Sequence, residues 1–291
     1  MRALGFTLAL LTAVAFGLYM VPRRFSRCSS DDFSTTMGIG IAITLALPLL
    51  GGPGRFVPGG FLLAVGSGLV FALATHLFIL AVDRLGLTRA TPVKNLAGVF
   101  GTLFGLTILA EYHSAGAALV LQLVLGSVMI AIGAYLIGGV GAPKEAGPGL
   151  RGSAGSFGLA LLSAACFGFY LVPLRLSAPL GTHLGYLGVG IGALLGLGLP
   201  HLLTGRFACS PRDGGLGLLS GVVLAVGVLL GTPATRIIGL SVAWPLTQLN
   251  TFVALAAGYF LLREFNAVGE RGRLLAASVL TLLGIACLAL L

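Results

Sequence analysis

Charge is scarce in this chain, and acidic residues are the scarcest of all. Only 8 Asp and Glu stand beside 17 Lys and Arg, and charged residues make up 9% of the 291 positions. Soluble domains carry about 25% charged residues, so this composition excludes an ordinary water-facing surface. A hydrophobic content of 57% and a mean hydropathy of +1.07 predict a membrane protein instead.

Motifs for catalysis, metal binding and nucleotide binding are also missing. No H-E-x-x-H cluster and no Walker loop occur, and no acid lies at the centre of an apolar run. The cysteines have no C-x-x-C spacing, which favours small apolar residues or loop thiols over disulfides or metal ligands; they are Cys28, Cys166, Cys209 and Cys287. The sequence therefore predicts no enzyme, no cofactor and no metal site. The formal charge of +9 is assigned to loops at a membrane surface rather than to nucleic-acid binding.

Long apolar runs dominate what is present. A membrane-spanning helix needs about 20 apolar residues, and continuous rather than alternating runs favour helices over a β-barrel. The predicted spans are 3–22, 35–51, 57–81, 92–110, 115–138, 156–174, 183–203, 214–234, 240–262 and 273–291. We interpret the first as a retained helix, because its counterpart at 156–174 lies in mid-chain, where no signal peptide is cleaved.

An internal repeat relates the two halves. The string from Phe16 to Pro22 returns 151 residues later as Phe167 to Pro173. Other matches follow at offsets of 152 and 153, including Gly38-Ile39-Gly40 with Gly190-Ile191-Gly192 and Leu109/Glu111 with Leu262/Glu264. Each copy holds five predicted spans, so the second copy crosses the membrane in the opposite sense.

The fold predicted from this repeat is an all-α membrane protein with ten transmembrane helices in two five-helix inverted repeats. The repeats cover 1–138 and 156–291, and a Gly/Pro-rich linker over 139–155 joins them. Thirteen of the 17 basic residues fall in loops after odd-numbered spans. The positive-inside rule puts those loops in the cytoplasm, at the cell (plasma or inner) membrane, with both termini outside.

Polar residues gather where the fourth and ninth spans begin. Proline suits a first helical turn, and amide groups in hydrocarbon need partners, which a polar solute or a neighbouring helix could supply. Tyr19 and Tyr170 precede the repeated prolines and fit either a cavity wall or an interfacial belt, while His76 fits either proton exchange or a structural hydrogen bond. The candidate solute-binding residues are Tyr19, His76, Lys94, Asn95, Tyr170, Trp244, Thr247, Gln248 and Asn250. The candidate kink or gate residues are Pro22, Pro92, Pro173 and Pro245.

The helix pattern resembles a known superfamily. The ends of the fourth and ninth spans, Gly105–Glu111 and Gly258–Glu264, resemble those of the drug/metabolite transporter superfamily, of the ten-helix EamA-like type. Gly17-x-Tyr19-x-Val21-Pro22-Arg23 and Val242–Gln248 are similar to the glucose/ribose/rhamnose-type sugar-uptake branch. The resemblance implies that a solute is held between the halves by helices 1, 3, 4, 6, 8 and 9.

We therefore expect a secondary active transporter that moves a small polar metabolite, in first place a sugar, by alternating access. An exporter of amino acids, drugs or other metabolites on the same fold is the nearest alternative. A non-transporting membrane scaffold or receptor is the alternative of another class. The expected partners are a small-molecule solute and the lipid bilayer; proton or sodium coupling, the direction of transport and the oligomeric state are left open.

Overall fold

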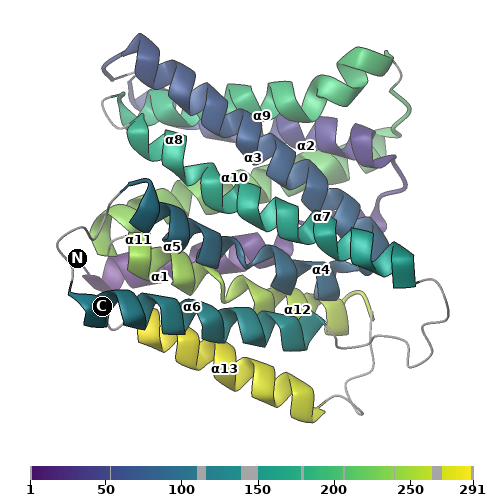
Figure 1. The fold of residues 1–291 in the computed structure, drawn as a ribbon. Helices are drawn as coiled ribbons and strands as arrows, with labels where there is room; N and C mark the ends of the chain where they lie inside the picture. The colour runs from purple at the N-terminus through teal and green to yellow at the C-terminus, as the bar shows by residue number, and fades with distance from the viewer. Residues whose placement is uncertain are drawn as a thin grey trace.

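The computed structural model describes residues 2–52, 54–109, 116–138, 150–177, 180–205, 207–238, 240–263 and 271–289, and its regular elements there are all helices (Figure 1). Six helical stretches are long and apolar enough to cross a membrane: Arg2–Phe25, Ser30–Gly51, Pro58–Leu85, Gly155–Leu176, Thr182–Leu203 and Pro211–Ile238. Two shorter apolar helical segments cover Val120–Ile130 and Gly272–Cys287. The prediction of an all-helical membrane protein is confirmed.

The helices follow the same order in both halves of the chain. The first half contains α1 (Arg2–Leu18), η1 (Pro22–Phe25), α2 (Ser30–Ala46), η2 (Leu47–Gly51), α3 (Pro58–Leu85), α4 (Leu87–Lys94), α5 (Ala97–Thr107) and α6 (Ala117–Gly138). The second half contains α7 (Leu150–Phe169), α8 (Leu171–Leu176), α9 (Thr182–Thr204), α10 (Pro211–Ile238), α11 (Leu240–Thr247), α12 (Asn250–Phe260) and α13 (Arg271–Ala289). α3 and α10 both have 28 residues, and each is followed by a pair of helices of 8 and 11 residues.

The helices pack into a closed ring, and from α1 to α7 neighbouring helices come from alternate halves of the chain. α1 packs on α10, α10 on α2, α2 on α9, α9 on α3, and α3 on α7. From α7 the ring continues through α4 and α5 to α6, then through α13 to α11, and α11 and α12 return to α1. Exchanging the two halves maps α1–α10 onto α7–α3 and α10–α2 onto α3–α9. Figure 1 shows the two pairs that map onto themselves, α2 with α9 and α6 with α13, on opposite sides of the molecule.

Glycines let the central helices touch at their backbones. Gly40 of α2 lies against Gly221 of α10, and its repeat equivalent Gly192 of α9 lies against Gly68 of α3. A Cβ added at Gly192 would collide with the carbonyl oxygen of Val65. Small residues at such positions permit the close approach of membrane helices.

Two predicted spans are broken rather than continuous. The span 92–110 is the pair α4 and α5, and the span 240–262 is the pair α11 and α12. The prediction that proline begins these helices is wrong, because Pro92 lies inside α4, and Pro245 lies within α11, which begins at Leu240. α4 begins directly after α3 because Gly86, with φ of 80°, turns the chain without a loop. α7 begins at Leu150, inside the predicted linker 139–155, and the rest of that linker lies outside the described part of the chain.

A disulfide contradicts the expectation for the cysteines. Cys28 and Cys209 are bonded across 181 residues of sequence, with their Cα atoms 5.2 Å apart, whereas Cys166 and Cys287 are free. The prediction was wrong because sequence spacing carries no information about this pair. Cys28 comes just before α2 and Cys209 just before α10, and these two helices are neighbours in the ring.

Candidate functional site

A small inner cavity is lined by residues from both halves of the chain. Its volume is about 20 Å³, which is about enough for one water molecule. All six predicted spans that the resemblance assigned to a cavity contribute lining residues. These residues lie on α1, α3, α4, α5, α7, α10, α11 and α12 or in the short segments that join them. The lining residues are Phe16, Tyr19, Phe71, Lys94, Ala97, Phe167, Tyr170, Leu224, Trp244, Thr247, Gln248 and Asn250.

Most lining residues come in repeat-equivalent pairs. At offsets of 151 or 153 residues, five pairs line the same cavity: Phe16 with Phe167, Tyr19 with Tyr170, Phe71 with Leu224, Lys94 with Thr247, and Ala97 with Asn250. The positions are therefore shared between the halves while the chemistry is not. The first half alone supplies a cation.

Lys94 is the charged residue of the inner cavity. Its exposed fraction is 7%, and its ammonium nitrogen lies 5.3–6.0 Å from the centroids of four aromatic rings, those of Phe16, Tyr19, Phe78 and Phe167. Cation–π contacts stabilise an ammonium group but leave its charge in place. Within the described residues, no carboxylate lies within ion-pair distance of it. The charge count had placed Lys94 in a loop, and the structure buries it.

Other polar groups around the cavity also lack partners. Within the described residues, the hydroxyl of Tyr19, Nε1 of Trp244 and Oε1 of Gln248 are buried and accept or donate no hydrogen bond. Leaving a buried polar group without a partner costs about 1–3 kcal/mol. The unbonded atoms form a set of donors and acceptors that a polar ligand could satisfy.

The breaks between short helices position these side chains. Asn95, in the break between α4 and α5, donates through Nδ2 to Asn250 Oδ1 and, at 2.5 Å, to Thr251 Oγ1 of α12. At the matching break, Thr247 Oγ1 and Gln248 Nε2 donate to the carbonyl oxygen of Trp244 at 2.6 and 3.2 Å. The interhelical hydrogen bond that the sequence left open is therefore present for Asn95, while Lys94 and Thr247 line the cavity.

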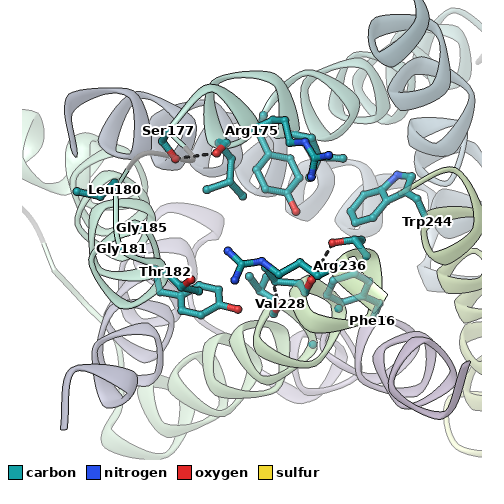
Figure 2. Close-up of a pocket in the computed structure, with 18 residues that line it drawn as sticks. Phe16, Arg175, Ser177, Leu180, Gly181, Thr182, Gly185, Val228, Arg236 and Trp244 are labelled. Carbon is teal, nitrogen blue, oxygen red and sulfur yellow. Dashed lines mark hydrogen bonds between the residues drawn. The ribbon is translucent and has the colours of Figure 1, made fainter. Parts of the chain in front are cut away.

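An outer cavity of about 130 Å³ opens next to the inner one (Figure 2). The two cavities share the side chains of Phe16, Tyr170 and Trp244. Arg175 from α8 and Arg236 from α10 enter the outer cavity from facing walls (Figure 2). Its remaining lining residues are neutral: Leu171, Leu174, Ser177, Leu180, Gly181, Thr182, Gly185, Tyr186, Gly227, Val228, Gly231, Thr232 and Thr235.

The opposite end of the ring is tied together. Arg23 is buried and forms a two-point ion pair with Asp83 at the end of α3. Ser30 also donates to Asp83, at 2.7 Å, and the disulfide between Cys28 and Cys209 lies at the same end. This face, the closed face hereafter, contrasts with the open face that carries Arg175 and Arg236.

The structure brings most predicted site residues together but not all. Seven of the nine candidates line the inner cavity, Asn95 lies next to it, and His76 lies outside it. Nδ1 of His76 is 2.9 Å from Ser34 Oγ, and Nε2 is 3.7 Å from Asp31. Pro22 begins η1 and Pro173 lies in α8, so both follow an interruption of their helix.

Sequence reasoning missed three arginines and the aromatic rings that surround Lys94. Arg175 and Arg236 were counted only as loop charges, Arg23 only as a loop charge and the end of a motif, and Phe16 and Phe167 only as parts of the repeat. The available signal was the repeat itself, because Arg236 stands 153 residues after Asp83. That substitution of a cation for an acid marks a position where the halves differ in charge.

No group of three or more His, Cys, Asp or Glu that could hold a metal ion is found among the described residues.

Comparison with known proteins gives one family and one fold. No curated protein matches the chain. A solved structure named "Crystal structure of protein" has 17% sequence identity and a TM-score of 0.66, and the match covers 100% of this chain and 98% of that one. This likeness concerns the fold alone. A family model described as "Sugar transport protein" matches residues 7–291, and the chain therefore belongs to the Sugar transport protein family.

Proposed function

We propose that the protein is a secondary active transporter that moves a small polar solute, in first place a sugar, across the plasma or inner membrane by alternating access. One observation carries the proposal: the inner cavity is lined by both halves at repeat-equivalent positions, such as Tyr19 and Tyr170. A site between two similar halves can be exposed to either side by rocking one half against the other.

The two halves are proposed to be inverted repeats of five spans each. The reciprocal helix pairings around the ring support this relation, as does the recurrence of the Gly40–Gly221 crossing at Gly192–Gly68. The same architecture supports membership of the drug/metabolite transporter superfamily. In such a fold the present arrangement, closed at Arg23–Asp83 and open at Arg236, is one of two exchangeable packings. The charge bias of the loops favours a cytoplasmic closed face and an outward-facing cavity, whereas the disulfide on the closed face favours the oxidising side of the membrane for that face.

The chemistry of the cavity suits a polyhydroxylated solute. Sugar hydroxyls both donate and accept hydrogen bonds, so they could satisfy Tyr19, Trp244 and Gln248 together. The indole ring of Trp244 offers a face on which a sugar ring could stack. The inner cavity holds about one water molecule as it stands, so the halves must separate there when the solute enters.

The test is uptake by purified protein in liposomes against a panel of labelled sugars, with and without an imposed proton gradient. We expect saturable uptake of at least one sugar class, and Trp244→Ala should weaken it strongly. Gln122→Ala, compared at matched protein content, serves as a control, because Gln122 bonds the carbonyl oxygen of Cys287 and lines neither cavity. Folded protein that gives no saturable uptake of any sugar would overturn the proposal.

A further inference from the structure

The route through the cavities is positively charged along its whole described length. We propose, on the basis of the transport function above, that the solute carries an anionic group, so that the cargo is an acidic sugar derivative with a carboxylate or phosphate. Lys94 lines the inner cavity, and Arg175 and Arg236 line the outer one. None of the residues that line either cavity is Asp or Glu.

Lys94 is the residue that needs an anion most. Its side chain is 93% buried, with four aromatic rings around the ammonium group and no carboxylate within ion-pair distance among the described residues. Burying an unpaired charge costs far more than burying a neutral polar group. A neutral sugar would leave the ammonium group without a counter-charge, whereas an anionic group would stabilise it by forming a charge-assisted hydrogen bond.

The two faces of the ring carry different charges at matched positions. On the closed face, Arg23 is paired with Asp83. On the open face, the position equivalent to Asp83 is Arg236, and the position equivalent to Arg24 is Arg175. The position equivalent to Arg23 is the neutral Leu174, so the open face has two cations and no acid where the closed face has two arginines and Asp83.

Two cations on facing walls resist closure, because like charges repel more strongly as water is excluded. A bound anion between Arg175 and Arg236 would take the place that a carboxylate such as Asp83 holds on the other face. Closure would then depend on the presence of the cargo. This arrangement selects for acidic solutes at the entrance, before Lys94 is reached.

The single tryptophan of the chain gives a direct binding signal. Trp244 lines both cavities, so its fluorescence should respond when either is occupied. Purified protein is titrated with galacturonate and its neutral parent galactose, and with glucose 6-phosphate and glucose. We expect one acid to bind about tenfold or more tightly than its neutral parent, since a hydrogen bond to a charged group contributes that much. The galacturonate and glucose 6-phosphate arms separate a carboxylate from a phosphate cargo.

Variants separate the cavity cations from the general charge of the surface. Lys94→Met and Arg236→Gln should each weaken binding of the acid about tenfold more than they weaken binding of the neutral parent. Arg55→Gln is the matched control, because Arg55 is exposed and its backbone carbonyl, rather than its side chain, accepts a hydrogen bond from Gly181 of the cavity wall. If Arg55→Gln weakens binding of the acid as much as Arg236→Gln does, the effect reflects surface potential and the proposal is overturned.

The outcomes for wild-type protein distinguish this proposal from the transport function. Equal affinity for galactose and galacturonate, together with saturable galactose uptake, would overturn the anionic cargo and leave the transporter in place. Absence of binding and uptake for all four compounds would overturn both. Preferential binding of an acid that depends on Lys94 and Arg236 supports both.

Discussion

Arg23 and Asp83 are joined by two parallel hydrogen bonds on the closed face, with Nε–Oδ1 and Nη2–Oδ2 distances of 2.8 and 2.7 Å. The same guanidinium group donates to the carbonyl oxygen of Cys28 at 2.8 Å and lies 5.0 Å from the ring centroid of Phe33. Two-point arginine–carboxylate pairs fix geometry as well as charge. This pair therefore holds the end of α3 against the segment that follows α1.

Asp83→Asn should open the closed face. The substitution leaves the buried guanidinium of Arg23 without its counter-charge, and breaking such a pair costs about 3–5 kcal/mol when it is fully buried, less here because Asp83 is 26% exposed. We expect uptake to fall about tenfold or more. The measurement is initial uptake rate in liposomes at matched protein content.

A charge exchange provides the control for this variant. The double variant Arg23→Asp, Asp83→Arg should recover part of the activity lost in Asp83→Asn, since the attraction is restored with reversed polarity. If the double variant is no more active than Asp83→Asn, the ion pair has no part in holding the face closed.

Sequence patterns predicted the all-helical membrane fold but not the pairing of charges. Composition and apolar runs predicted the helices because they are properties of the chain itself, and the repeat-equivalent Tyr19 and Tyr170 line one cavity. The Cys28–Cys209 bond and the Arg23–Asp83 pair depend on which helices become neighbours in the ring, and no local pattern encodes that.

Helix ends show a second limit of sequence reasoning. Pro92 was expected at a helix start, yet α4 begins at Leu87 and ends two residues after the proline. Pro92, the strongest local signal, correctly indicated a helix boundary in this region but not the residue at which α4 begins. What decided the place was Gly86 with φ of 80°, a conformation that the sequence allows but does not require.

Gly192→Ala should destabilise the fold. A Cβ at this position would collide with the carbonyl oxygen of Val65 and the backbone of Gly68, so α3 and α9 would have to separate. Forcing extra atoms into a packed contact costs about 1–3 kcal/mol, and we expect a lower melting temperature in detergent. Gly198→Ala, on the same helix, is the control because a Cβ there meets no atom within 4 Å. Equal melting temperatures for the two variants would contradict the crossing.

Gln248→Ala should raise the KM for uptake without lowering the amount of protein. The amide of Gln248 is buried at the inner cavity, and its Oε1 accepts no hydrogen bond from the described residues. Its loss therefore removes a group available to solute rather than a link between helices. Gln122→Ala, which removes the link to Cys287 between α6 and α13, should lower stability instead. Unchanged uptake kinetics in Gln248→Ala would remove this residue from the site.

The cysteine pairing can be counted directly. We expect maleimide–polyethylene glycol to add two tags to denatured, unreduced protein, at Cys166 and Cys287, and four tags after reduction, because Cys28 and Cys209 are joined. Electrophoresis resolves the number of tags. The double variant Cys28→Ser, Cys209→Ser should show two tags under both conditions. Four tags on unreduced wild-type protein would mean that these two cysteines are not bonded.

His76→Gln should leave the affinity for solute unchanged, within about twofold as for substitutions away from a site. His76 lies on α3 outside the inner cavity, where its ring contacts Ser34 and approaches Asp31 near the closed face. Glutamine can keep a hydrogen bond to Ser34 but cannot exchange a proton near neutral pH. The measurement is KM with and without a proton gradient, beside the cavity variant Gln248→Ala. A large rise in KM would bring His76 back into the site, and loss of the gradient's effect with KM unchanged would assign it to proton coupling instead.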